Sequence, residues 1–87
     1  MSQKDHHGVT GRQIAAARTL LGIGQAELAA SASISVPTLK RMEASEGPAP
    51  GMPNNVRAVI DALEAAGLEF IPENGGGAGI RFRDREA

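Results

Sequence analysis

The side chains best suited to chemistry in this sequence lie between residues 35 and 41. They combine hydroxyls, two cations and small apolar groups: Ser35, Val36, Pro37, Thr38, Lys40 and Arg41. Hydroxyl, ammonium and guanidinium groups donate hydrogen bonds to phosphates and to base edges. A short exposed helix that begins with small residues and ends with two cations therefore suits a DNA groove. The alternative is that Lys40 and Arg41 form only a solvated helix face.

Two other groups also have phosphate-binding chemistry. Gln25 lies at a predicted helix start, where the N–H groups of the first turn and a side-chain amide can together hold a phosphate. The alternative is that Gln25 is only a polar surface residue. Near the C-terminus, Arg81, Arg83 and Arg85 form a second cationic group. Pairing with Glu69 or with solvent is the favoured interpretation there.

The sequence offers little for catalysis or for metal binding. The chain has no Cys, and its two histidines, His6 and His7, are adjacent in a polar N-terminal segment. Adjacent histidines point in different directions and have no third ligand nearby, so we expect a tail and no metal site. Because no nucleophile–base pair or cofactor motif is evident, we expect no enzyme and no cofactor.

Two short helices must position the side chains between residues 35 and 41. Helical periodicity predicts one helix over 25–32 and another over about 36–43, joined by a tight polar turn. Ser35 is the expected N-cap of the second helix, and Pro37 lies in its first turn, where a missing N–H does no harm. The apolar residues that would lock the two helices together are Leu28, Ala29, Ala32, Ile34, Leu39 and Met42.

Two further helices complete the predicted bundle. Thr10 and Gln13 have the spacing of a capping box at the start of a helix over 11–21, which is followed by two helix-stopping glycines. After a loop rich in Gly and Pro, Asn54 or Asn55 is expected to cap a fourth helix.

The C-terminal part changes to β-type patterning. Short runs at 68–71 and 79–83 alternate apolar with charged residues across a glycine-rich segment, which predicts a hairpin with Glu69 opposite an arginine. An isolated hairpin is only marginally stable, and its two exposed edges invite pairing with a second copy. We therefore expect the hairpin to form a dimer contact, with these apolar residues: Leu68, Phe70, Ile80 and Phe82.

Length and composition limit the class of protein. The 87 residues make one small domain, for which oligomerisation is a reasonable source of stability. A net charge of −1 argues against a non-specific nucleic-acid coat but not against a specific reader, because only the local field over the contact face matters. No apolar run approaches a membrane span and no segment looks like a signal peptide, so we expect a soluble, cytoplasmic protein.

The expected fold class is mainly α, with four to five short helices in a compact bundle and a C-terminal β-hairpin. The expected organisation is a disordered tail over 1–9, a helical domain over 10–67, the hairpin over 68–83, and a short tail over 84–87.

The stretch from residue 22 to residue 43 resembles a known motif. The residues Gly22-Ile23-Gly24-Gln25, Leu28-Ala29, Ser35-Val36-Pro37-Thr38-Leu39 and Arg41-Met42-Glu43 are similar to the helix-turn-helix of phage Cro and C1 repressors and their bacterial XRE-type relatives. The resemblance covers roughly residues 13–68 and implies a lambda-repressor-like, DNA-binding domain.

The resemblance also implies roles for single residues. It implies that Gln25 binds a DNA phosphate and braces the recognition helix, and that Arg18 pairs with Glu43. Base-reading positions fall on Val36, Pro37 and Arg41, with Thr38 and Lys40 beside them or on phosphates.

Two features differ from the family's pattern. Ser33 occupies a turn position where the family often has Gly, and because serine is less favourable in the left-handed conformation, a turn of different build is expected. Val36 and Pro37 offer contacts to thymine methyls but no bidentate hydrogen bonds, which leaves Arg41 as the one strong base reader.

We therefore predict a homodimeric, sequence-specific transcriptional regulator, preferably a repressor, that binds an inverted repeat in double-stranded DNA. The alternative is a protein-interaction module, such as an antitoxin or anti-activator, that holds another protein. The near-neutral charge, the few hydrogen-bonding groups at residues 36 and 37, and the pairing-prone hairpin keep this alternative open.

Overall fold

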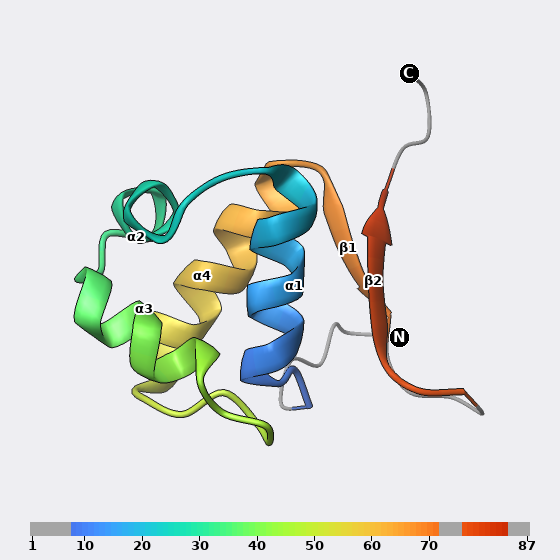
Figure 1. Cartoon of the computed structure of the whole chain (residues 1–87), viewed down its shortest axis with the longest axis horizontal. Coiled ribbons are helices and arrows are strands. Elements are labelled where there is room, and N and C mark those ends of the chain that lie inside the picture. The colour runs from blue at the N-terminus through green and yellow to red at the C-terminus, as the bar shows by residue number, and fades with distance from the viewer. Residues whose placement is uncertain (1–7, 72–75, 84–87) are drawn as a thin grey trace.

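Four helices and a two-stranded antiparallel hairpin form the fold in the computed structural model, which describes residues 8–71 and 76–83 (Figure 1). The elements are α1 (Gly11–Leu21), α2 (Gln25–Ala32), α3 (Val36–Glu43), α4 (Pro53–Ala65), β1 (Leu68–Ile71) and β2 (Gly79–Phe82). The mainly helical class and the hairpin agree with the prediction. His6, His7, Arg85 and most of both predicted tails lie outside the described residues.

Local capping sets the limits of α1. The Thr10 hydroxyl accepts from the Gln13 backbone N–H, and the Gln13 side-chain oxygen accepts from the Thr10 N–H at 2.9 Å, which completes the predicted capping box. Gly22 ends the helix in the left-handed conformation, at φ 74°, as glycine does without steric cost.

The start of α4 differs from the prediction. Its N-cap is Met52, with no side-chain cap hydrogen bond, and Pro53 is the first helical residue. Asn54 and Asn55 lie inside the first turn, so the expected asparagine cap is wrong. Proline has a fixed φ suited to the first helical position and no N–H to leave unsatisfied there, so the helix begins two or three residues earlier than expected.

The core is aliphatic and draws on every helix. The fully buried larger side chains are Ile14, Leu28, Leu39, Met42, Val59, Ile60, Leu63 and Leu68. Val9, which we expected in a tail, is only 7% exposed and belongs to this core. Its carbonyl accepts from the Ala49 N–H, and Thr10 forms a β-bridge with Pro48, so the long loop before α4 holds the segment that precedes α1.

The hairpin forms one outer layer of the fold. β1 packs on α4 and β2 on α1, and Figure 1 shows α3 on the other side of α1 from the strands. In the antiparallel register Leu68 faces Phe82 and Phe70 faces Ile80, so these four side chains share one face of the hairpin.

This placement changes the expectation for one residue of the predicted dimer contact, Leu68. Leu68 is fully buried, and Phe70 and Ile80 pack against the chain's own core, so the apolar face of the hairpin covers the helices of its own chain. Phe82, at 45% exposure, is the member of that group with substantial access to solvent. A second copy therefore cannot use Leu68.

Candidate functional site

The connection between α2 and α3 brings the predicted site residues together. Ser33 ends α2 in the left-handed conformation, at φ 58°, and its N–H donates to the carbonyls of Ala29 and Ala30. The expectation of a turn built differently was wrong: serine adopts the same conformation that glycine takes at such helix ends, at some energetic cost. Three residues therefore suffice to join the two helices.

The first turn of α3 is fixed by hydroxyl groups. Ser35 is its N-cap, and the Ser35 hydroxyl accepts from the Thr38 N–H at 3.2 Å and donates to Thr38 Oγ1 at 2.8 Å. Because the Ser35 proton is used in this bond, the Thr38 hydroxyl is the group with a proton left to donate to a ligand. The Ser35 hydroxyl thus orients the Thr38 hydroxyl.

The last turn of α3 is fixed by a buried carboxylate. Glu43 is only 8% exposed and accepts from Arg18 Nε at 2.9 Å and Arg18 Nη2 at 3.0 Å, so the expected ion pair is present and bidentate. Gln25 Nε2 also donates to Glu43, at 2.9 Å, and Arg18 Nη1 donates to the Ile23 carbonyl at 3.2 Å. One carboxylate therefore ties α1 and the start of α2 to the end of α3. We call Arg18, Gln25 and Glu43 the Glu43 network.

This network also affects the ionisation of Arg18. The hydrogen bond to Glu43 raises the pKa of the Arg18 guanidinium above its ordinary value; burial opposes this shift, and the charge of Glu43 makes a smaller contribution in the same direction as the hydrogen bond. A raised pKa gives a stabilisation that is fully present below the ordinary value and is lost only as the pH rises above it. Arg18 stays charged in neutral solution.

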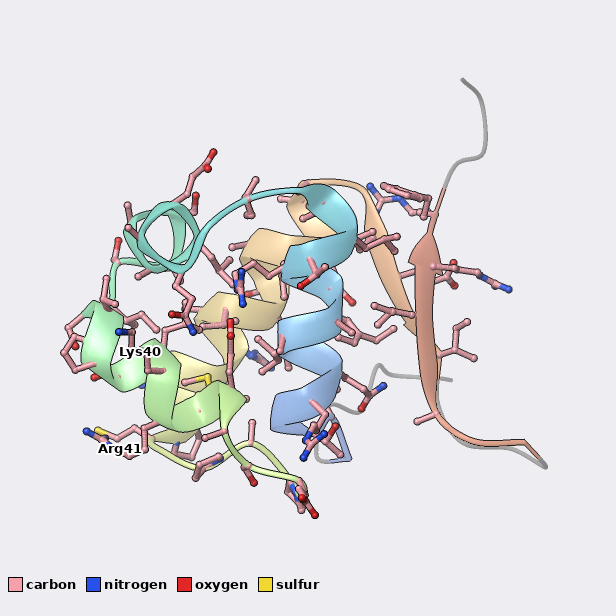
Figure 2. The ribbon with its side chains drawn as sticks, in the orientation of Figure 1. Lys40 and Arg41 are labelled. Carbon is pink, nitrogen blue, oxygen red and sulfur yellow. The ribbon has the colours of Figure 1, made fainter. Side chains whose placement is uncertain are left out.

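α3 presents one strip of residues to solvent. Pro37, Lys40, Arg41 and Ala44 recur at helical spacing on the side opposite the buried Leu39, Met42 and Glu43, and all four are exposed. We call these four residues the α3 outer face. Figure 2 shows Lys40 and Arg41 extending from the part of the molecule farthest from the hairpin. Within the described residues, neither cation makes a hydrogen bond or an ion pair.

Two residues lie differently from the expected reading face. Val36 is half-buried and packs against the core, so only part of its side chain is available to a ligand. Ala44, which sequence reasoning did not include, extends the outer face by one turn. Its spacing of seven residues from Pro37 is the signal that would have identified it.

The start of α2 has free donors beside Gln25. Gly24 is the N-cap and makes no side-chain hydrogen bond, so the N–H groups of the first turn are not capped by a side chain. Gln25 is half-buried, and one of its amide protons is bound to Glu43, so the second remains for a ligand. The exposed carboxylate of Glu27 in the same turn weakens the attraction for an anion.

The other candidate groups are occupied within the chain. Arg81 donates to Glu69 at 3.2 Å across the hairpin, which is the arginine partner expected for Glu69, and Arg83 donates to the Glu64 carbonyl at 2.9 Å. Over residues 8–71 and 76–83, no three acidic, histidine or cysteine side chains are grouped as metal ligands. In the same ranges, no helix has both the length and the apolar character to cross a membrane.

Comparison with known proteins assigns no family. No family model matches the chain, and no curated protein matches it.

Proposed function

We propose that the chain is a sequence-specific DNA-binding transcriptional regulator, of helix-turn-helix type, that inserts α3 into the major groove. The observation that carries the proposal is the α3 outer face. Two cations without partners in the described chain stand on a short helix whose two ends are fixed by Ser35 and by the Glu43 network. A helix whose backbone is already fixed loses little backbone conformational entropy when it binds a duplex.

Each residue of the site has a stated role in this proposal. Arg41 makes a bidentate contact with a guanine, and Lys40 and the Thr38 hydroxyl contact phosphates. Gln25 contacts a phosphate with its second amide proton while the first keeps it bound to Glu43. Pro37 and Ala44 offer small apolar surfaces, which suit thymine methyl groups and allow a close approach of the helix to the bases.

Fluorescence anisotropy with an operator selected from random DNA tests the proposal. Arg41→Ala should weaken binding by about 1–3 kcal/mol at the cognate base and relax the preference there, whereas Lys40→Ala should weaken all sequences alike. Arg81→Ala is the matched control, because Arg81 is an exposed cation on the far side of the molecule from α3. Equal binding by the parent, Arg41→Ala and Lys40→Ala would refute the groove assignment.

Salt dependence separates this proposal from a protein-interaction role. Phosphate contacts release counterions, so the logarithm of the DNA affinity should fall linearly with the logarithm of salt concentration. Affinity that does not change with salt, together with stable 1:1 co-purification of another protein, would favour the protein-interaction module. A repressor also predicts lower transcription from a promoter that contains the selected operator.

A further inference from the structure

Within residues 8–71 and 76–83, no strand pairs with the edge of β2 that faces away from β1. Arg83 N–H donates to the Gly67 carbonyl at 2.7 Å, so residues 67 and 83 form a hydrogen-bonded pair of the antiparallel ladder. Such pairs alternate along a ladder, so the N–H and C=O groups of Ile80 and Phe82 point away from β1. These groups form a short row of donors and acceptors at the edge of the sheet.

The opposite edge, on β1, is less accessible. By the same alternation, Leu68 and Phe70 point their backbone groups away from β2, but Leu68 is completely buried as a residue. On β2, Ile80 is half-buried, Phe82 is 45% exposed, and Gly77 and Ala78 before the strand are exposed. The fold thus covers one edge of the hairpin and leaves the other open.

We propose that β2 pairs with β2 of a second copy of this chain, which makes one four-stranded antiparallel sheet. Identical strands that pair edge to edge are related by a two-fold axis, as in most protein dimers. With Ile80 on that axis, Ile80 lies opposite its counterpart and Ala78 lies opposite Phe82, and each pair exchanges two hydrogen bonds. This pairing satisfies the open edge and covers the exposed Phe82 ring.

The charges of the strand disfavour the registers that are shifted from this one toward Arg83. Placing Ile80 on the axis sets Arg81 opposite Gly79, so no two cations face each other. A shift that placed Arg81 on the axis would put it directly opposite its own copy, and one further shift would put it opposite Arg83. Like charges directly opposite each other destabilise paired strands.

The paired sheet places both copies of α3 on one side. A two-fold axis between paired antiparallel edges runs perpendicular to the sheet, so the helices of both copies lie on the same face. Since α3 lies beyond α1 from the strands, both α3 helices then lie on that same side of the paired sheet (Figure 1).

The consequence of this arrangement for DNA binding rests on the proposed function. A two-fold dimer that presents one such helix per copy reads two half-sites separated by one helical turn, about 34 Å, or a multiple of it. Two half-sites on one face of a duplex, about 10 bp apart, are therefore the expected operator. The strand pairing itself does not depend on DNA binding.

Sedimentation of the full chain without DNA tests the pairing. Phe82→Pro removes the edge N–H of residue 82 from both copies but takes no donor from the ladder with β1, so it should raise the dimer dissociation constant about tenfold or more. Phe82→Ala keeps the N–H and should have a smaller effect. Leu20→Ala, which truncates a residue of similar exposure (44%) on α1, should have none. Two results would overturn the pairing. One is a parent chain that stays monomeric at about 100 μM, about 100 times the dissociation constant of a micromolar dimer. The other is a folded Phe82→Pro variant whose dimer dissociation constant is unchanged.

Cysteine cross-linking gives a second test that does not depend on a proline. The chain has no native Cys. In the proposed register, Gly79→Cys and Arg81→Cys in one chain face each other across the two-fold axis and should form an intermolecular disulfide under mild oxidation. Glu69→Cys is the control. Residue 69 lies on the same face of the sheet but on β1, so the two β2 strands separate it from residue 69 of the second copy, and it should not cross-link.

The outcomes separate the two proposals. Absence of a Gly79→Cys/Arg81→Cys disulfide refutes the register. A monomer that binds the selected operator refutes the pairing and leaves the DNA proposal intact. A cross-linked dimer that binds no DNA supports the pairing and refutes the DNA proposal.

Discussion

Removing the Glu43 carboxylate should destabilise the fold more than any surface charge does. Glu43→Ala leaves three N–H donors of Arg18 and Gln25 without their acceptor. The Glu43 side chain is 6% exposed and the Arg18 side chain 20% exposed, so water replaces the lost acceptor only in part. Glu43→Ala therefore tests whether the network holds the three helices together.

The size of the effect follows from this partial burial. Breaking a buried ion pair by removing one partner costs about 3–5 kcal/mol. Arg18 keeps its bond to the Ile23 carbonyl and some access to solvent, so we expect a smaller loss than this, about 2–3 kcal/mol. For a domain of this size, that corresponds to a fall in the midpoint of thermal unfolding of about 10–20 °C.

Urea denaturation followed by circular dichroism measures the change in unfolding free energy. Arg12→Ala is the matched control, because it removes a 2.9 Å ion pair with Glu46 whose side chains are 66% and 80% exposed, and such pairs contribute less than about 1 kcal/mol. The double variant Arg18→Met/Glu43→Leu replaces both charges by apolar groups and should be more stable than the sum of the single variants predicts. If Glu43→Ala costs no more than Arg12→Ala, the network does not stabilise the fold.

Two backbone positions give further predictions. Ser33→Gly should stabilise the chain by up to about 1 kcal/mol in urea denaturation, because Ser33 has φ 58° and glycine adopts that conformation without strain; Ser33→Ala should give no such gain. Gly11→Ala should destabilise the chain by about 3 kcal/mol or more in the same measurement, because a Cβ at residue 11 would overlap the carbonyl oxygens of Met42 and Ser45. Gly24→Ala is the control, because a Cβ at residue 24 has no atom nearby. Equal stability of the two variants would contradict the overlap.

Local sequence signals predicted most of the elements but not their long-range contacts. The capping box at Thr10, the Ser35 cap and the hairpin register around Glu69 depend on residues close in sequence or on simple alternation. The burial of Val9 depends on the loop around Ala49, some forty residues away, so no local pattern reveals it. The hydrogen bond from Gln25 to Glu43 is likewise long-range.

The hairpin shows why an apolar stripe alone cannot identify a partner. Alternation correctly placed Leu68, Phe70, Ile80 and Phe82 on one face, but the same pattern serves a chain's own core and a dimer interface equally well. The structure separates the two uses, because the face covers the chain's own helices. What is left for a second copy is the backbone edge, which side-chain patterns do not describe.

The rigidity of α3 comes from its surroundings, since an eight-residue helix is too short to be stable alone. Leu39 and Met42 anchor its middle, Ser35 its start, and Glu43 its end. These contacts leave the outer face with only Lys40 and Arg41 as charged groups, so a single helix has few contacts with which to select a sequence. Two helices fixed relative to each other by a shared sheet would add their contacts and would also measure the spacing and shape of the duplex. Under the proposed DNA-binding function, selectivity should therefore depend on the β2 edge as much as on Arg41.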